Sequence, residues 1–372
     1  MVATSGSSEG IQRLVRSDLV SFGGYAASKS PKTLMGKTNV PVEDIIKLDA
    51  NENPYGCSPR VNKALATCPD MNIYPDSGQL ELRKLLEDYT GVSAKHIVAG
   101  AGSDQLIDLI LRLFLEPGDE VINLVPTFAM FRFFTELSGG TAVEVPRDEN
   151  FAVNVSAVKK AITKKTKLIL LATPNNPTGT LIPREDILKL LDSGLPLLVD
   201  EAYYEFSGET VASLVGKYQN LMVLRTFSKW AGLAGLRIGY GLFPTKTADC
   251  LLRIKEPYCV NVAALVAVRE SLKDVDYLMG RVKVILAERE RLFGELKKLK
   301  WLKPFPSQAN FILCSVLVGA RQLQQKLESR GILVRYFDEA LLRDCIRISV
   351  GRPEENDILF ETLNELGEEL ND

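Results

Sequence analysis

Residues 221–229 have the sequence LMVLRTFSK, and this stretch decides the fold class. The apolar run at 221–224 predicts a buried strand, and the polar residues that follow it include one lysine, Lys229. In open α/β sheets, ligands bind beyond the carboxyl ends of the strands, so a lysine at this point can form a Schiff base with a carbonyl cofactor. Taken alone, a solvated loop lysine is the commoner explanation of so short a motif. The other motifs of the chain are needed to distinguish a Schiff-base lysine from a solvated one.

The strand pattern of 221–224 is repeated elsewhere in the chain, with helical patterns such as 184–192 between several of the strands. The other apolar runs bounded by turn residues are 121–125, 167–173, 196–199 and 238–242. Strands that alternate with helices predict a largely parallel sheet covered by helices on both faces. Residues 303–372 show a different order, with short strands and two helices, which is typical of a compact α+β unit.

The composition excludes several classes of protein. Lys and Arg number 45 and Asp and Glu 47, so the basic excess of a nucleic-acid or membrane-surface protein is missing. The chain has a single histidine, His96, which argues against a catalytic triad built on histidine and against a metal site with several histidine ligands. We therefore expect no metal. Six dispersed cysteines without a C-x-x-C pair predict free thiols in a reducing compartment. With no apolar run of about 20 residues, we expect a soluble protein, cytoplasmic or, after loss of a transit peptide, in a plastid stroma.

Small residues and hydroxyls near Lys229 indicate a phosphate-binding cup. The segment AGLAGL at 231–236 permits a tight loop that returns an arginine toward the lysine. The segment AGAGSD at 99–104 opens a predicted helix, and the free N–H groups of a helix N-terminus attract anions. The candidate cup residues are Gly102, Ser103, Thr226, Ser228 and Arg237.

Two other strands also end in polar residues. The strand at 196–199 ends in Asp200, where a carboxylate can pair with the protonated nitrogen of a pyridine ring. Tyr203, three residues on, can donate to the oxygen of such a ring. For Asp200, a cap of the following helix is an alternative of similar weight. Asn176, in the motif PNNPTG at 174–179, can bond a ring hydroxyl, although this composition also suits a simple turn.

Arg347 stands inside the apolar segment CIRISVG at 345–351. An arginine within a buried strand is costly unless something pairs with it. A substrate carboxylate or phosphate would supply that pairing. An internal salt bridge is the alternative.

In their order and approximate spacing, these segments resemble the fold-type I aminotransferases, from about residue 47 to residue 370. Within that group the chain is similar to the histidinol-phosphate aminotransferase family, above all to its plant-type members. The motifs of this likeness are LDANENPYG at 48–56, YPD at 74–76, TFSK at 226–229 with AGLAGLR at 231–237, and QANF at 308–311. The resemblance implies an α/β fold, with a large domain built on a mostly parallel seven-stranded sheet between helices and a smaller α+β domain.

Combined with the strand pattern, the resemblance also implies a domain organisation. We expect an N-terminal arm at 1–45, a small domain from 46–75 and 303–372, a large cofactor-binding domain at 76–260 and a long linking helix at 261–302.

By resemblance, the cofactor is pyridoxal 5′-phosphate (PLP), and Lys229 and Asp200 match the Schiff-base lysine and the partner of the pyridine nitrogen. Asn176 and Tyr203 match the donors to the ring oxygen, and the resemblance implies that Tyr203 is a catalytic residue together with Lys229 and Asp200. The cup residues match the phosphate site. The remaining matches are Phe128 stacked on the ring, Tyr74 reaching the phosphate from a neighbouring subunit, and Asn51, Tyr25, Arg335 and Arg347 at the substrate. The chain departs from the family at Gly24, where proline is usual before the tyrosine, and at Gln105 and Trp230.

The activity implied by the resemblance is transfer of an amino group between glutamate or 2-oxoglutarate and imidazole-acetol phosphate or histidinol phosphate, in histidine biosynthesis. It also implies a homodimer with shared active sites. An aromatic amino-acid aminotransferase and a threonine-phosphate decarboxylase share this scaffold and stay open as alternatives. A nicotinamide-dependent dehydrogenase is remote, because no G-x-G-x-x-G follows a strand near the N-terminus. A non-catalytic PLP-binding domain of a regulator is disfavoured by the full set of catalytic residues.

Overall fold

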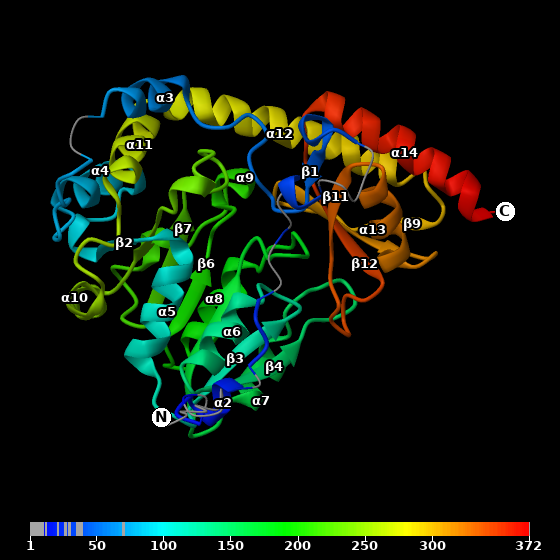
Figure 1. The fold of residues 1–372 in the computed structure, drawn as a ribbon. Coiled ribbons are helices and arrows are strands. Elements are labelled where there is room, and N and C mark those ends of the chain that lie inside the picture. The colour runs from blue at the N-terminus through cyan, green and yellow to red at the C-terminus, as the bar shows by residue number, and fades with distance from the viewer. Residues whose placement is uncertain are drawn as a thin grey trace, which may run out of the picture.

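The computed structural model describes residues 11, 13–20, 22–25, 28, 31–34, 40–68 and 71–371. Two β-sheets lie apart in it, a seven-stranded sheet and a five-stranded sheet (Figure 1). Helix α12 (Val275–Leu296) runs along the top of Figure 1, from the side of the larger sheet to that of the smaller one. None of the described helices has both the length and the apolar character needed to cross a membrane.

The larger sheet has the strand order β2-β8-β7-β6-β5-β3-β4. Its strands are β2 (Ile97–Gly100), β3 (Glu120–Val125), β4 (Thr141–Pro146), β5 (Thr166–Ala172), β6 (Leu197–Asp200), β7 (Leu221–Thr226) and β8 (Gly239–Leu242). Strand β8 runs antiparallel to both of its neighbours, whereas the other pairs are parallel. The predicted mostly parallel seven-stranded sheet is therefore confirmed.

The central strands are apolar along their whole length because both faces of the sheet are covered. Along β6, Leu197 and Val199 join one core and Leu198 joins the other, as the two-residue period of a strand requires. Helices α5 (Gly102–Phe114), α6 (Met130–Leu137) and α10 (Thr245–Ile254) supply side chains to the core of Leu198. Helices α4 (Leu80–Thr90), α7 (Val155–Ala161), α8 (Arg184–Leu191) and α11 (Val262–Leu272) supply the other core.

The smaller sheet has the order β1-β11-β12-β10-β9 and joins distant parts of the chain. Its strands are β1 (Ile46–Leu48), β9 (Leu302–Pro304), β10 (Phe311–Val316), β11 (Ile332–Tyr336) and β12 (Cys345–Ser349), and its neighbouring helices are α13 (Ala320–Ser329) and α14 (Pro353–Asn371). Strand β1 pairs in parallel with β11, and the other pairs are antiparallel. This pairing brings the segment just before Asn51 beside the C-terminal unit.

The expectation of one long helix over 261–302 is wrong. The structure has two helices, α11 and α12, which are separated at Lys273 and Asp274. Asp274 takes a non-helical backbone conformation, and its carboxylate accepts a hydrogen bond from Ser58, the N-cap of α3 (Pro59–Ala66). Aspartate favours such breaks, because its side chain competes with the backbone for hydrogen bonds.

Helix α3 packs against α11, so it lies with the larger sheet and not with the small unit to which 46–75 was assigned. We therefore propose a small domain that takes only the β1 strand from the N-terminal part. The short helices α2 (Ser17–Val20) and α9 (Tyr204–Ser207), and the 3-10 turns η1 (Pro31–Leu34), η2 (Val42–Asp44), η3 (Ala94–His96), η4 (Ala212–Leu214) and η5 (Ala234–Leu236), complete the described elements.

Candidate active site

A cavity of about 550 Å³ lies at the carboxyl ends of β5, β6 and β7, where side chains from both sheets meet. This is the edge at which open α/β sheets bind ligands. The cavity brings together predicted site residues that are far apart in the chain. Those that line it are Tyr25, Asn51, Ser103, Phe128, Asn176, Asp200, Tyr203, Thr226, Ser228, Lys229, Arg237, Arg335 and Arg347.

Lys229 reaches across the cavity, and its Nζ donates to the backbone oxygen of Ala50 at 2.9 Å. Burial, together with the positive charge of Arg347, lowers the pKa of Lys229 to about 8. A sizeable fraction of this amine is therefore neutral near physiological pH, and only the neutral form can act as a nucleophile or a base.

Asp200 ends β6 inside the cavity, with 5% of its surface exposed. Burial raises the pKa of its carboxyl to about 7. Oδ1 accepts a hydrogen bond from the amide of Ala202 at 2.9 Å, and Asp200 has no ion pair with any residue that the structure describes. The helix-cap alternative is wrong, because the N-cap of α9 is Tyr203. A buried carboxyl without a cation suits a cationic ring nitrogen.

Tyr203 is held by residues that come from both ends of the chain. Its hydroxyl oxygen accepts from Nδ2 of Asn51 at 2.9 Å, and Oδ1 of Asn51 accepts from the hydroxyl of Ser349 at 2.9 Å. Asn51 adopts a left-handed backbone conformation, with φ of 54°, which asparagine tolerates better than most residues. Burial raises the pKa of Tyr203 to about 12, so its hydroxyl keeps its proton as a hydrogen-bond donor.

Arg347 lies in β12 with 6% of its surface exposed. Its Nη1 donates to Oδ1 of Asn176 at 2.5 Å, and its Nη2 donates to the carbonyl of Asp49 at 2.6 Å. The buried Nε has no hydrogen-bond partner, and no ion pair joins Arg347 to a described carboxylate. The internal salt bridge considered above is therefore not what the structure contains. An uncompensated buried cation of this kind favours an anionic ligand.

The predicted cup forms where α5 begins. Gly102 has a φ of 81°, a backbone conformation that favours glycine, and its lack of a Cβ leaves room for Nη2 of Arg237. Nη2 of Arg237 also donates to Asp104 at 2.9 Å. The Thr226 hydroxyl donates to Ser228 at 3.0 Å. Hydroxyls, a guanidinium and the N-terminus of a helix together match the chemistry of a phosphate group.

These observations fit PLP. The carboxyl of Asp200 lacks an ion-pair partner among the described residues, the cup offers donors to an anion, and Lys229 supplies an amine in the same cavity. Phe128 adds an aromatic side chain to the cavity wall. The residues present can therefore hold the ring, the phosphate and the carbonyl carbon of this cofactor.

Two of the predicted site residues do not line the cavity. Tyr74 is 77% exposed and outside the cavity, where its ring stacks on Tyr258 at 4.4 Å between centroids. Gly102, predicted as a cup residue, does not line the cavity, but it lies next to the guanidinium of Arg237. The sequence did not predict two contacts within the site: the hydrogen bond of Lys229 to the carbonyl of Ala50, and that of Arg237 to Asp104. A backbone acceptor leaves no signal in a sequence, but Asp104 directly follows Ser103 of the cup and could have been inferred.

Comparisons with known proteins agree with this geometry. The family "Aminotransferase class I and II" matches residues 43–363. A histidinol-phosphate aminotransferase of Dehalococcoides mccartyi is 56% identical over 359 residues, which cover 96% of this chain and 99% of that protein. The chloroplastic histidinol-phosphate aminotransferase 1 of Arabidopsis thaliana is 45% identical over 327 residues, 87% of this chain and 78% of that protein. The bacterial relative is thus more similar than the plant one, although the plant-type members had been expected to be nearest.

Among solved structures, histidinol-phosphate aminotransferase from Sinorhizobium meliloti in complex with pyridoxal-5′-phosphate superposes with a TM-score of 0.87. The sequence identity is 28%, and the match covers 96% of this chain and 98% of that one. The fold is therefore that of a protein whose structure was solved with this cofactor bound.

Proposed function

The chain belongs to the class I and II aminotransferase family, and we propose that it transfers an amino group between glutamate and imidazole-acetol phosphate, or in reverse from histidinol phosphate to 2-oxoglutarate, in histidine biosynthesis. It is a PLP-dependent enzyme of fold type I. The observation that carries the substrate assignment is the 56% identity over nearly the whole length of a histidinol-phosphate aminotransferase. The uncompensated Arg347 beside Lys229 in one cavity supports it.

When bound, PLP supplies an aldehyde carbon for the substrate amine and a ring that accepts an electron pair. Lys229, neutral in part because of its lowered pKa, would take the proton from the substrate α-carbon and would later give a proton to the carbon that carries the cofactor's aldehyde. The Asp200 carboxylate would hold the ring nitrogen in its cationic form. Tyr203 and the amide nitrogen of Asn176 would donate to the ring oxygen, and the cup residues would bind the phosphate.

One site has to accept both glutamate and a phosphorylated amino alcohol. Arg347 offers a planar fork of donors, which binds a carboxylate or a phosphate oxygen pair. Arg335 lies in the same cavity, where its guanidinium faces the rings of Tyr25 and Phe337 at 5.9 and 5.7 Å. Two arginines in one cavity suit partners that share negative charge but differ in shape.

We also propose a homodimer in which Tyr74 completes the partner's site. Its support is the number of exposed apolar side chains in the chain segments around Tyr74 and around Tyr258, on whose ring Tyr74 stacks, because exposed apolar surface often marks a protein interface. These exposed side chains are Met71, Ile73, Tyr74, Leu80, Ile254 and Tyr258. The six free thiols support a reducing compartment, which we propose to be the cytoplasm or a plastid stroma.

The substrate proposal is tested by comparing amino donors at equal enzyme concentration. We expect kcat/KM for histidinol phosphate with 2-oxoglutarate to exceed the value for phenylalanine by at least tenfold. We expect no release of carbon dioxide from threonine phosphate. A higher kcat/KM for an aromatic amino acid would move the assignment to an aromatic aminotransferase, and carbon dioxide release would move it to a decarboxylase. The Lys229→Ala variant is expected to have no transaminase activity with any donor.

A further inference from the structure

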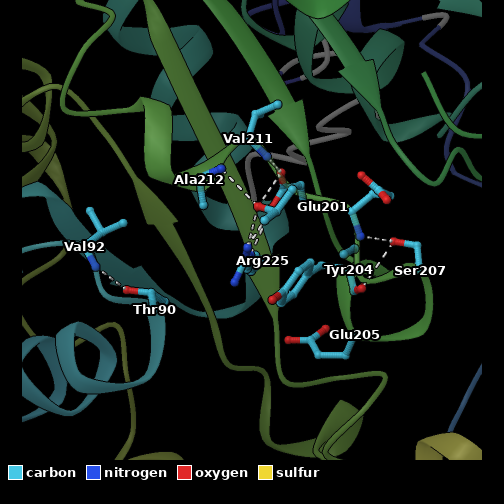
Figure 2. A network of polar contacts seen from close by, with 12 residues as sticks. Thr90, Val92, Glu201, Tyr204, Glu205, Ser207, Val211, Ala212 and Arg225 are labelled. Atoms are coloured by element: carbon cyan, nitrogen blue, oxygen red, sulfur yellow. Dashed lines mark hydrogen bonds and ion pairs between the residues drawn. The ribbon is translucent and has the colours of Figure 1, made fainter. Parts of the chain in front are cut away.

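Two residues that adjoin proposed cofactor-binding residues in the chain form a buried ion pair with each other. Glu201 follows Asp200 at the end of β6, and Arg225 precedes Thr226 at the end of β7. Nε and Nη2 of Arg225 donate to Oε2 of Glu201 at 3.0 and 2.9 Å, and the two side chains are 4% and 0% exposed (Figure 2). Because successive residues of a strand point to opposite faces, the pair lies on the other side of the sheet from the cavity that Asp200 and Thr226 line.

The Glu201 carboxylate has partners on both oxygens. Oε1 accepts from the amide of Val211 at 2.7 Å, and the hydroxyl of Thr210 donates to Oε2 at 2.7 Å. The Arg225 guanidinium lies over the ring of Tyr204, with Cζ 3.6 Å from the ring centroid. Burial opposes the charge on Arg225, but its interactions with Tyr240, Glu201 and Glu205 keep its pKa above the ordinary value.

Stability alone does not account for such a pair. A buried ion pair loses so much hydration that well-packed apolar residues in its place are often neutral or stabilising. What the pair adds is fixed geometry, because two donors of one planar guanidinium converge on a single carboxylate oxygen and so restrict how the two side chains, and the strand ends that carry them, lie relative to each other. The amide of Glu201 also donates to the carbonyl of Leu224 at 2.8 Å, so side chain and backbone join the two strands at the same level.

We propose that Glu201 and Arg225 are positioning residues that set the span between Asp200 and Thr226, and with it the distance between the ring-nitrogen end and the phosphate end of the cofactor site. The inference rests on the proposed roles of Asp200 and Thr226. A ligand that touches both ends binds tightly only when both contacts are met at once, as in any bivalent interaction. A ligand that touches one end alone is insensitive to the span.

Three ligands separate a positioning role from a structural one. Pyridoxamine 5′-phosphate reaches both ends without a covalent bond to Lys229, pyridoxamine reaches only the ring end, and inorganic phosphate reaches only the cup. Their dissociation constants are measured by calorimetry on the full-length protein freed of cofactor. The variants are Glu201→Gln, Arg225→Lys and the apolar double variant Glu201→Leu with Arg225→Met, each checked for folding by circular dichroism. The control is Asp357→Asn, which removes an ion pair with Arg291 between α12 and α14.

In folded variants of the pair, the Kd for pyridoxamine 5′-phosphate is expected to rise about tenfold. The Kd values for pyridoxamine and for inorganic phosphate are expected to change by less than about twofold, and the control is expected to leave all three unchanged. Equal weakening of all three ligands, or wild-type affinity for pyridoxamine 5′-phosphate in the folded double variant, would overturn the positioning role. If single variants do not fold, the double variant decides. A wild-type protein that binds pyridoxamine 5′-phosphate no more tightly than its two parts would instead overturn the proposed site.

Discussion

The Nη1 atom of Arg347 donates to Oδ1 of Asn176 across 2.5 Å, which joins a strand of the smaller sheet to the loop after β5 of the larger one. Because this contact occupies the amide oxygen, the amide nitrogen of Asn176 remains as the donor toward the cavity. The arginine proposed to bind substrate therefore also orients an amide proposed to bind the cofactor.

The Arg347→Lys variant keeps the charge but loses the planar fork. We expect kcat/KM for histidinol phosphate to fall roughly 100-fold, mostly through KM, since charge-assisted bidentate contacts contribute about 1.5–3 kcal/mol. Steady-state kinetics check this, and the matched control is Arg343→Lys, which changes an exposed arginine four residues earlier in the chain. A variant with wild-type KM for both histidinol phosphate and glutamate would contradict the role of Arg347.

The amine of Lys229 is expected to titrate near pH 8 in the protein freed of cofactor, because burial and Arg347 lower its pKa. Its neutral, reactive fraction therefore rises as the pH rises through about 8 rather than above 10. Competitive acetylation across a pH series, read by mass spectrometry, measures this midpoint. In Arg347→Leu the midpoint is expected to move upward, because one positive charge is gone. A wild-type midpoint above 10 would show that the amine is not tuned by its surroundings.

Glu205 affects stability in a pH-dependent way. Burial raises the pKa of its carboxyl to about 7, so the folded state holds this proton more tightly than the unfolded state does. Its contribution is fully present below pH 4.5 and is lost as the pH rises through about 7. Glu205→Gln, which can still accept from Tyr89, is therefore expected to increase the free energy of unfolding at pH 8, by an amount on the order of 1–3 kcal/mol, and much less at pH 4.5.

Denaturant unfolding at the two pH values measures the effect of Glu205→Gln. The exposed Glu149→Gln serves as the control and is expected to change stability little at either pH. An equal effect of Glu205→Gln at both pH values would contradict the raised pKa.

Shared active sites predict complementation between two defective chains. Lys229→Ala and Tyr74→Ala each impair their own homodimer. A mixed dimer has one site with both defects and one intact site, so dissociation and random reassociation are expected to restore about a quarter of the wild-type activity. Activity that never exceeds the mean of the separate variants would show that Tyr74 does not act across a subunit boundary.

The sequence predicted those features that are local. The apolar runs that became β5, β6 and β7 were found because burial on both faces makes a strand continuously apolar. Strand β4 was missed because it lies at the edge of the sheet and exposes part of its length. Strand β1 was missed because three residues give too short a pattern.

The candidate site was predicted as a group because several polar motifs stand at the ends of neighbouring parallel strands. The Glu201–Arg225 pair could not be predicted, because it depends on the register of two strands that are paired in space but separated by 24 residues. The break between α11 and α12 was missed for the same reason, since it involves Ser58, far away in the sequence.

The most direct test of the central claim is the visible absorbance of the purified protein before and after addition of histidinol phosphate without any oxo acid. We expect an absorbance band from cofactor linked to Lys229, which histidinol phosphate converts to the pyridoxamine phosphate band and which is absent in Lys229→Ala. A band that histidinol phosphate leaves unchanged, while phenylalanine or another amino acid converts it, would contradict the proposed substrate. A protein that shows no such band with added PLP would contradict the cofactor site itself.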